Sequence, residues 1–251
     1  MSLRTAAFSV YALLIAASAP FTVGSAIAES EVTHGPPRVP SEIIIYIHPE
    51  VTDRGFVGPL VCELEKVLVA PVSAKDLPLL LGSDLKATQT QLDATQIADR
   101  FRQATMAEGD SSAFKHFIIA QDITVRPYNY LFASTFGIDG ETSPLQIIST
   151  TRIASRYSKP PTAAQIALTT QRLYKIIIRS IVQSTGNASL SGCVMSFANS
   201  IVEHDRKSSD FCAPDRAHLV HQGVLREREI DGCQAVAQGK SRGLISFLRL
   251  E

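Results

Sequence analysis

The strongest single indication of the fold is the stretch PPTAAQIALTTQRLYKIIIRSIVQSTGN, residues 160–187. Two prolines end the preceding segment, Thr162 is a favoured helix N-cap residue, and helix-forming residues continue to about Ser184. The Thr-Gly-Asn sequence that follows is typical of a helix end. We therefore predict a long central helix over about residues 162–184. Its apolar side chains cover much of the circumference and include Ile166, Leu173, Ile177 and Ile181.

Outward from this helix, short apolar runs indicate a sheet. Residues 42–47 (EIIIYI) form a continuous apolar run that is typical of a buried strand, and residues 117–120 and 145–149 are further strand candidates. Between the last two we expect an aromatic loop that contains Tyr128, Tyr130, Phe132 and Phe136.

Two more helical patterns lie between the expected strands. Leu60, Leu64 and Leu68 recur at helical spacing, and Asp93 is a favourable N-cap for a helix over residues 94–105. Strands that alternate with helices favour an α/β fold, in which helices cover the faces of a compact mixed sheet.

The composition narrows the class of protein. The chain has 251 residues, 45% of them hydrophobic, and its 24 lysines and arginines balance 24 aspartates and glutamates. This length suits one ordinary globular domain or two small ones, and the hydrophobic content is not that of a disordered chain. A neutral chain has no overall positive field to attract a phosphate backbone, so we expect no nucleic-acid partner.

The first 28 residues have the pattern of a secretory signal peptide. Arg4 precedes an apolar run over residues 6–21, and the small-residue triplet Ala26-Ile27-Ala28 lies just before an acidic residue. Polar residues interrupt the run, which falls short of the roughly 20 apolar residues of a membrane span. We therefore expect a periplasmic or secreted protein of bacterial type, with no integral membrane segment once residues 1–28 are removed. Residues 29–40 then form a proline-rich lead.

Four cysteines lie in the expected mature chain: Cys62, Cys193, Cys212 and Cys233. In an oxidising compartment an even number of cysteines favours disulfides, and four cysteines allow three sets of two pairs. The spacing alone does not choose among these pairings.

The residues after the long helix resemble a known family. The segment CVMSFANSIVEHDRK, residues 193–207, followed by Cys212-Ala213-Pro214, is similar to the C-terminal signature of archaemetzincins, zinc metallopeptidases of the metzincin group. That signature has a Cys-x-Met turn, a Phe-Ser-Asn-Ser-like run, an Asp-Arg-Lys triplet and a Cys-x-x-Cys pair. The resemblance implies a metzincin-like domain over residues 41–215, with Met195 in the Met-turn. Residues 216–251 would be a C-terminal extension without a counterpart.

The family's catalytic motif is where the resemblance ends. In archaemetzincins the long helix ends in His-Glu-x-x-His-x-x-Gly-x-x-His-Cys, in which three histidines bind zinc and the glutamate is the general base. If Gly186 is set on the glycine, Arg179 and Gln183 stand at the two helix histidines. Ser180 then stands at the glutamate and Ser189 at the third histidine. None of these side chains can do the work of the residue that it replaces.

The positions of the histidines support this interpretation in any register. Residues 117–203, where the motif must fall, contain no histidine, since the six histidines are His34, His48, His116, His204, His218 and His221. We therefore expect no catalytic residues, no bound metal and no cofactor. The resemblance then implies a pseudopeptidase with a cleft for a peptide or protein ligand. We hypothesise that Arg179 replaces the lost ion electrostatically and receives a peptide carboxylate or carbonyl; the alternative is an ordinary helix-end arginine.

The resemblance also implies a disulfide. Four cysteines hold a structural zinc in the family, and Cys193 and Cys212 match two of them, whereas Leu190 and Asp215 stand at the other two. Two thiolates that share a zinc lie close enough for a disulfide once the metal is lost. A Cys193–Cys212 bond is therefore expected, and with it a Cys62–Cys233 bond that would hold the extension against the first helix.

Three alternatives stay open. A rival zinc or copper site would use four residues spaced three apart, although this series drifts by about 60° per step around a helix: Cys212, Asp215, His218 and His221. Its two histidines would otherwise lie on the surface of a short helix. An active zinc-dependent metallopeptidase would need a rearranged site with ligands from His204, His218 or His221. A disulfide-stapled structural protein of the cell envelope would have its old cleft filled by side chains. The sequence does not indicate the oligomeric state.

Overall fold

The computed structural model describes residues 38–106, 112–137, 143–154, 160–187 and 189–230. The expected signal peptide, nearly all of the proline-rich lead, Cys233 and the end of the extension lie outside the described residues. Within the described ranges, no helix is long and apolar enough to cross a membrane.

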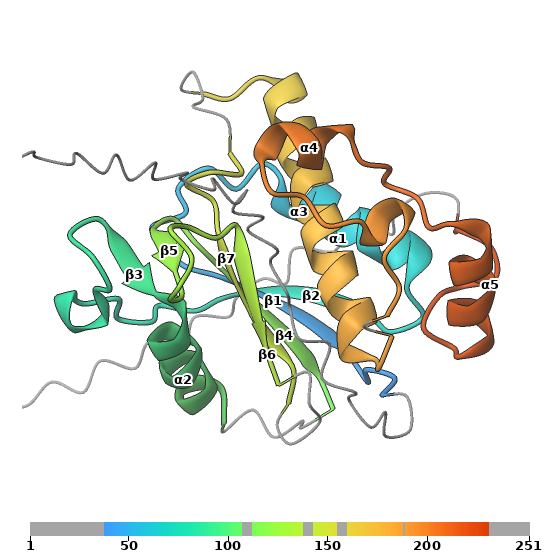
Figure 1. Ribbon diagram of the computed structural model, residues 1–251, viewed down its shortest axis with the longest axis horizontal. Helices are drawn as coiled ribbons and strands as arrows, with labels where there is room; N and C mark the ends of the chain where they lie inside the picture. The colour runs from blue at the N-terminus through green and yellow to red at the C-terminus, as the bar shows by residue number, and fades with distance from the viewer. Residues whose placement is uncertain (1–37, 107–111, 138–142, 155–159, 188, 231–251) are drawn as a thin grey trace, which may run out of the picture. The chain divides into compact units, whose positions relative to one another are not determined.

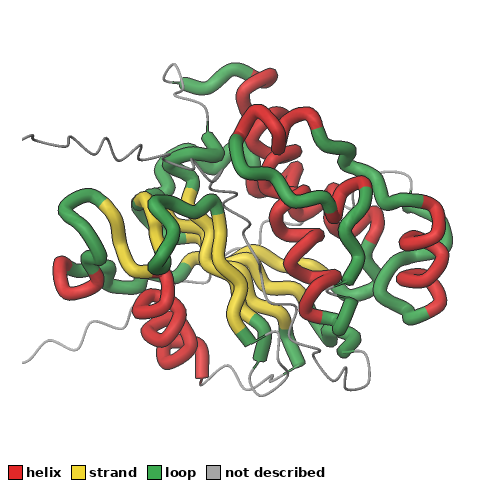
Figure 2. Tube along the Cα trace, viewed as in Figure 1, coloured by secondary structure: helices red, strands yellow, loops and turns green. Residues whose placement is uncertain are grey.

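A five-stranded sheet organises this part of the chain (Figures 1 and 2). The strand order is β2-β1-β4-β7-β6, and neighbouring strands are parallel except at one edge, where β6 runs antiparallel to β7. The strand bounds are β1 Ile43–Ile47, β2 Val72–Asp76, β4 Phe114–Ile119, β6 Ala133–Phe136 and β7 Leu145–Ser149. The prediction of a mixed α/β sheet with covering helices is confirmed.

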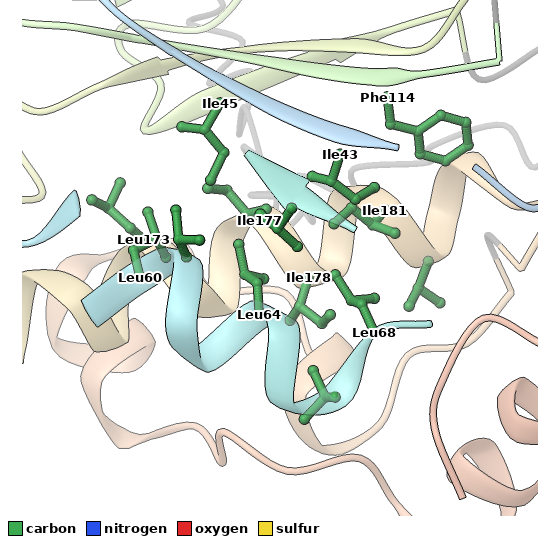
Figure 3. Close-up of a cluster of buried hydrophobic side chains, with 14 of the residues drawn as sticks. Ile43, Ile45, Leu60, Leu64, Leu68, Phe114, Leu173, Ile177, Ile178 and Ile181 are labelled. Carbon is green, nitrogen blue, oxygen red and sulfur yellow. The ribbon is translucent and has the colours of Figure 1, made fainter. Parts of the chain in front are cut away.

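Alternate side chains of β1 enter two different hydrophobic clusters, because successive residues of a strand point to opposite faces. Ile43, Ile45 and Ile47 belong to the cluster formed with α1 (Val57–Val67) and α3 (Ala163–Ser184), part of which is shown in Figure 3. Ile44 and Tyr46 belong to the cluster formed with α2 (Ala94–Thr105). Helices therefore cover both faces of the sheet, which explains why β1 is apolar at every position.

The central helix α3 begins and ends where its sequence predicts. Thr162 Oγ1 accepts a hydrogen bond from the Gln165 N–H at 3.3 Å, and Gln165 Oε1 accepts one from the Thr162 N–H at 2.8 Å. These two bonds form a capping box. The helix ends at Ser184, and Gly186 follows with a φ of +94°, a conformation that favours glycine. The prediction of a long central helix is confirmed.

The two shorter helices of the core also follow their sequence patterns. Asp93 caps α2, since its carboxylate accepts hydrogen bonds from the backbone N–H groups of Thr95 and Gln96 at 2.8 and 3.3 Å. Helix α1 places Leu60 and Leu64 in the core, and it ends at Val67, so that Leu68 is its C-cap.

The stretch expected to be an aromatic loop contains a strand, which corrects that expectation. β6 lies within it, and its four residues, Ala-Ser-Thr-Phe, are only partly buried. They lack the apolar run of a buried strand, so the pattern does not indicate one. Just upstream, β5 (Asp122–Thr124) pairs in parallel with β3 (Gln91–Asp93) as a separate two-stranded sheet.

After α3 the chain packs back onto that helix. It forms a 3₁₀ turn, η3 (Cys193–Met195), and two helices, α4 (Ile201–Arg206) and α5 (Ala213–His221). Leu219, Val224 and Leu225 join the cluster of α1 and α3, so residues beyond 215 are part of the packed core. A further 3₁₀ turn, η1 (Ser83–Leu85), follows β2.

Candidate functional site

The C-terminal half of α3 carries the positions of the expected catalytic motif. Arg179 and Gln183 are four residues apart and share one helix face, and Ser180 is buried, with 3% of its surface exposed. Gly186 turns the chain with its positive φ, and Ser189 lies beyond it on the surface. The backbone is therefore that of a helix followed by a turn, whereas the side chains are not those of a zinc site.

Arg179 has no hydrogen bond or ion pair with any described residue. Its guanidinium carbon lies 5.2 Å from the centre of the Phe197 ring, which is a cation–π contact. The Nε atom is buried and makes no hydrogen bond. Burial lowers the pKa of Arg179 from its ordinary value, and no acidic group offsets that effect. A partly buried cation without an anion is unfavourable, because the lost hydration is not compensated.

A row of buried polar side chains ends at Ser180. His116 on β4, Gln146 on β7 and Thr135 on β6 are neighbours across the sheet. His116 Nδ1 lies 3.0 Å from Gln146 Oε1, and Gln146 Nε2 donates to Thr135 Oγ1 at 3.3 Å. Thr135 Oγ1 lies 3.1 Å from Ser180 Oγ. Burial lowers the pKa of His116 to about 4, so the imidazole at the inner end of the row is neutral.

Residues 192–210, which we call the Met-turn segment, are held against α3 by an ion pair. Arg172, only 8% exposed, donates from Nε and Nη2 to the two carboxylate oxygens of Asp205 at 2.7 and 2.6 Å. Its Nη1 donates to the Ile153 carbonyl at 2.6 Å. The hydrogen bonds from Arg172 lower the pKa of Asp205. All three nitrogens of this guanidinium are therefore satisfied.

Two lysines and a histidine complete the attachment. Lys175 Nζ donates to the carbonyl oxygens of His204 and Lys207 at 3.1 and 2.7 Å. Lys207 Nζ donates to two further carbonyls of the Met-turn segment at 3.1 and 3.2 Å. His204 Nε2 lies 3.0 Å from the Arg172 carbonyl, and burial, together with the nearby lysines, lowers the pKa of His204 to about 4. The Asp and Lys of the Asp-Arg-Lys triplet thus anchor the segment.

A disulfide joins Cys193 and Cys212, with their Cα atoms 5.4 Å apart, and so links the Met-turn segment to the start of α5. Gly192 lies against this bond, since a Cβ atom at that position would be 2.8 Å from Cys212 Sγ. Cys62 is also disulfide-bonded, and its expected partner, Cys233, lies outside the described residues. Met195 is buried in the cluster of α1 and α3.

The described residues do not bring the rival metal site together. The Cys212 sulfur is bonded to Cys193, and His218 Nε2 lies 3.0 Å from Asn187 Oδ1. His204, a ligand in the rearranged-site alternative, is buried against the Arg172 carbonyl. Within the described ranges, no three His, Cys, Asp or Glu side chains are grouped so that they could hold a metal ion.

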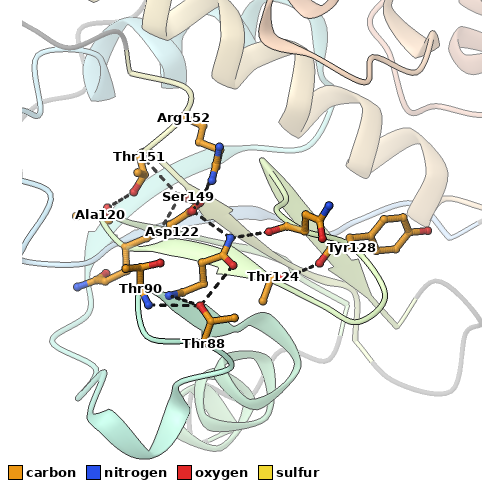
Figure 4. Close-up of polar contacts among 12 residues, drawn as sticks. Thr88, Thr90, Ala120, Asp122, Thr124, Tyr128, Ser149, Thr151 and Arg152 are labelled. Atoms are coloured by element: carbon orange, nitrogen blue, oxygen red, sulfur yellow. Dashed lines mark hydrogen bonds and ion pairs between the residues drawn. The ribbon is translucent and has the colours of Figure 1, made fainter.

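A polar cluster and a cavity lie at the carboxyl ends of β4 and β7 (Figure 4). Arg152 donates from Nε and Nη2 to the carboxylate of Asp122 at 2.9 and 2.7 Å, and Gln91 Nε2 donates to the same carboxylate at 3.1 Å. A cavity of about 590 Å³ is lined in part by Asp122, and another of about 430 Å³ lies beside Tyr174. Neither cavity is lined by the four positions of the motif, Arg179, Ser180, Gln183 and Ser189.

The polar side chains that surround the candidate site are not predicted by the sequence patterns described above. His116, Gln146, Arg172 and Lys175 are all buried, and each lies within an apolar strand or helix pattern. A polar residue at a core position of such a pattern must find partners, so these four interruptions were the available signal.

Comparison with known proteins gives structural matches only. No family model matches the chain, and no curated protein matches it either. The crystal structure of archaemetzincin from Archaeoglobus fulgidus, complexed with malonate, is 21% identical with a TM-score of 0.51, and the match covers 70% of this chain and 98% of that one. A zinc-dependent peptidase from Methanocorpusculum labreanum is 21% identical with a TM-score of 0.55, covering 70% and 99%. Archaemetzincin from Methanopyrus kandleri is 18% identical with a TM-score of 0.51, covering 74% and 97%.

These matches show that the chain has an archaemetzincin-like fold, as the resemblance of the Met-turn segment implies. The matched structures are covered almost completely, so the fold of the whole relative is present here. At this level of identity the matches concern the fold alone, and the chemistry must be judged from the residues at the site.

Proposed function

We propose that this protein is an exported pseudopeptidase, with the fold of a zinc peptidase and a cleft that binds a peptide or protein segment without cleaving it. The observation that carries the proposal is the composition of α3 at the motif positions. Arg179, Ser180 and Gln183 occupy the face on which zinc ligands and a general base would be needed. Zinc requires nitrogen, sulfur or carboxylate donors, and the guanidinium of Arg179 is a cation that repels it.

The residues around these positions do not supply a substitute metal site. Ser180 is hydrogen-bonded to Thr135 and lacks a carboxylate that could take a proton from water. His116 is the inner end of the hydrogen-bonded row that leads to Ser180, and it is buried behind Gln146 and Thr135. The donor set therefore does not fit zinc, and no hydrolytic step follows from it.

Peptide binding is supported by the sheet edge next to these positions. Among the described strands, β6 pairs only with β7, so its other edge is unpaired within the described residues, and a strand added there would complete its backbone hydrogen bonds. Thr135 on this strand contacts Ser180, which places the edge beside the end of α3. Phe197, 68% exposed, lies over Arg179, and Tyr130 donates a hydrogen bond to the Asn199 carbonyl of the same segment. A free edge flanked by exposed aromatic rings suits an extended peptide.

Export is supported by the cysteines. The Cys193–Cys212 disulfide and the bonded state of Cys62 are typical of an oxidising compartment. Fractionation of cells that express the full chain tests this part, since the expected result is a processed, disulfide-bonded protein outside the cytoplasm.

The decisive experiment measures metal content and cleavage on the same preparation. We expect well under one equivalent of zinc per chain, no cleavage of a pool of quenched fluorescent peptides, and no effect of a chelator. One equivalent of zinc with chelator-sensitive cleavage would show the alternative, an active zinc metallopeptidase with a rearranged site.

Binding is tested separately, by retention of a pool of random pentapeptides on the immobilised protein. We expect retention that falls in the Phe197→Ala variant and persists in Met106→Ala, which removes an apolar side chain of similar exposure at the end of α2. No retention would favour the remaining alternative, a structural envelope protein whose cleft is filled.

A further inference from the structure

The charge around Arg179 is not balanced by the described residues. Five cations lie on α3 and the Met-turn segment, against three acids, Glu203, Asp205 and Asp210; the cations are Arg172, Lys175, Arg179, Arg206 and Lys207. Asp205 is bound to Arg172 through both carboxylate oxygens. Lys175 and Lys207 are held by carbonyl oxygens, which carry no full charge. Burial lowers the pKa of Lys207 to about 8, and repulsion from the Arg179 charge adds to that shift.

Within the described ranges, Arg179 finds no other compensation for its charge. The negative end of the α3 dipole acts within the last turn, whereas Arg179 lies more than a turn before the helix end at Ser184. The Phe197 ring provides a cation–π contact but accepts no hydrogen bond from the guanidinium plane.

The two terminal nitrogens of Arg179 remain available to a ligand. Nε is the only atom of this guanidinium that is both buried and without a partner. Nη1 and Nη2 make no hydrogen bond to a described residue and are not buried, so they are open to solvent. A guanidinium in this state matches a carboxylate, which accepts two parallel hydrogen bonds and neutralises the charge. A peptide carbonyl would accept a hydrogen bond but would leave the charge in place.

Resting on the proposed function, we infer that the ligand carries a carboxylate, and specifically that the site binds the free C-terminal carboxylate of a peptide. The edge of β6 aligns the backbone of that peptide, and Arg179 receives its last residue. We commit to the chain end because Thr135, on the edge strand β6, contacts Ser180, the neighbour of Arg179 in the chain, so a backbone paired with β6 would run beside this turn of α3. Ser180 follows Arg179 in the chain, and its buried hydroxyl lies 3.1 Å from Thr135 Oγ1 of β6. At this contact α3 approaches the edge strand.

Three matched peptide pools test this inference. All are N-acetylated random pentapeptides; the first lacks Asp and Glu and ends in a free carboxylate, the second is the same pool with a C-terminal amide, and the third is the amide pool with one internal glutamate. Retention on the immobilised full protein is measured by mass spectrometry. We expect the free-acid pool to be retained at least tenfold more than either amide pool, and the preference to weaken as salt is raised.

Variants locate the effect. Arg179→Met should abolish the preference for the free acid, and Arg179→Lys should keep part of it, because a lysine retains the charge but loses the two-pronged geometry. Arg102→Met serves as the matched control, since Arg102 is on α2 and pairs with Asp99 at 3.2 Å. It should behave as the wild type, and circular dichroism of each variant verifies that it is folded.

The outcomes separate the inference from the proposed function. Equal retention of the acid and amide pools would overturn the carboxylate inference and leave peptide binding in place. Preferential retention of the internal-glutamate pool would overturn the assignment to a chain terminus. If no pool is retained, both the inference and the binding part of the proposed function fail.

Discussion

Arg172 and Arg179 of α3 differ in their hydrogen-bond partners, although they are seven residues apart and so lie on nearly the same helix face. Arg172 makes three charge-assisted or carbonyl hydrogen bonds and is almost completely buried. Arg179 makes none with a described residue and has one nitrogen buried without a partner. The first arginine holds the Met-turn segment in place, whereas the second has no hydrogen-bonding or charged partner among the described residues. The difference indicates which of the two belongs to a site.

The contrast between the two arginines also distinguishes polar groups that stabilise the fold from polar groups that can bind a ligand. Most polar groups that serve the fold are satisfied within it, because an unpaired buried group costs stability. Arg102 Nε, His116 Nε2 and Thr169 Oγ1 are also buried without a hydrogen bond, but Arg102 still pairs with Asp99, whereas no nitrogen of Arg179 has a partner among the described residues. A group left unsatisfied beside an open sheet edge is the expected exception at a functional site.

The largest effect should come from removing the partner of Arg172. In Asp205→Asn the buried guanidinium loses its counter-charge, and we expect the free energy of unfolding to fall by about 3 kcal/mol. Urea denaturation measures the loss. The control is Asp99→Asn, which breaks the exposed pair with Arg102 and should cost less than about 1 kcal/mol. Equal losses in the two variants would show that Arg172 and Asp205 are not a structural pair.

Acid should weaken the same attachment through His204. The pKa of His204 is about 4 in the folded protein, below the ordinary value of 6.5. As the pH falls below 6.5 the unfolded chain therefore takes up a proton before the folded one does, and stability is lost down to about pH 4. We expect the share of His204 to be on the order of 2 kcal/mol at pH 5. Urea denaturation at pH 7 and pH 5 measures it. In His204→Gln the drop between the two pH values should be smaller by that amount, while the drop that depends on His116 should remain.

A smaller loss is expected where the Met-turn segment meets the disulfide. In Gly192→Ala the new Cβ atom would lie 2.8 Å from Cys212 Sγ, which a bonded sulfur cannot easily avoid, and we expect a loss of about 1–2 kcal/mol. Gly58→Ala is the matched change, since nothing lies within 4 Å of its Cβ in α1. That variant should be unchanged or more stable by up to about 1 kcal/mol. Thermal melts of the pair decide the point, and a stable Gly192→Ala would contradict the close contact.

The smallest effect on stability should come from Arg179 itself. In Arg179→Met an unpaired cation is replaced by an apolar side chain of similar length, so the free energy of unfolding should stay within about 1 kcal/mol of the wild type. A loss above about 2 kcal/mol in urea denaturation would mean that Arg179 is a structural residue like Arg172. The comparison between the two arginines would then fail.

Much of the fold follows from sequence, because it rests on strong local patterns. The capping residue Thr162 and the turn at Gly186 bound α3, the carboxylate of Asp93 caps α2, and the apolar run at 43–47 forms β1. β6 could not be found in this way, since an edge strand need not be apolar and its identity depends on pairing with β7. The order of the strands likewise depends on contacts between distant segments.

The candidate site was predicted only in part. The expected replacement of the catalytic motif rests on the register of Gly186 in the sequence, whereas the lack of a hydrogen-bonding partner for Arg179 among the described residues could not be predicted from it. It depends on which acids reach α3, and Asp205 lies thirty-three residues from Arg172 in the chain. The row from His116 to Ser180 is likewise assembled from three strands and a helix, and no local spacing describes it.

The bond between Cys193 and Cys212 changes what this chain requires from its surroundings. A fold that is stabilised by a bound metal forms where that metal is available, and it is lost when a chelator removes the ion. A fold that is stabilised by a disulfide needs an oxidant once, when the bond forms, and its stability then does not depend on the supply of metal. This attachment is therefore vulnerable to reductants and not to chelators.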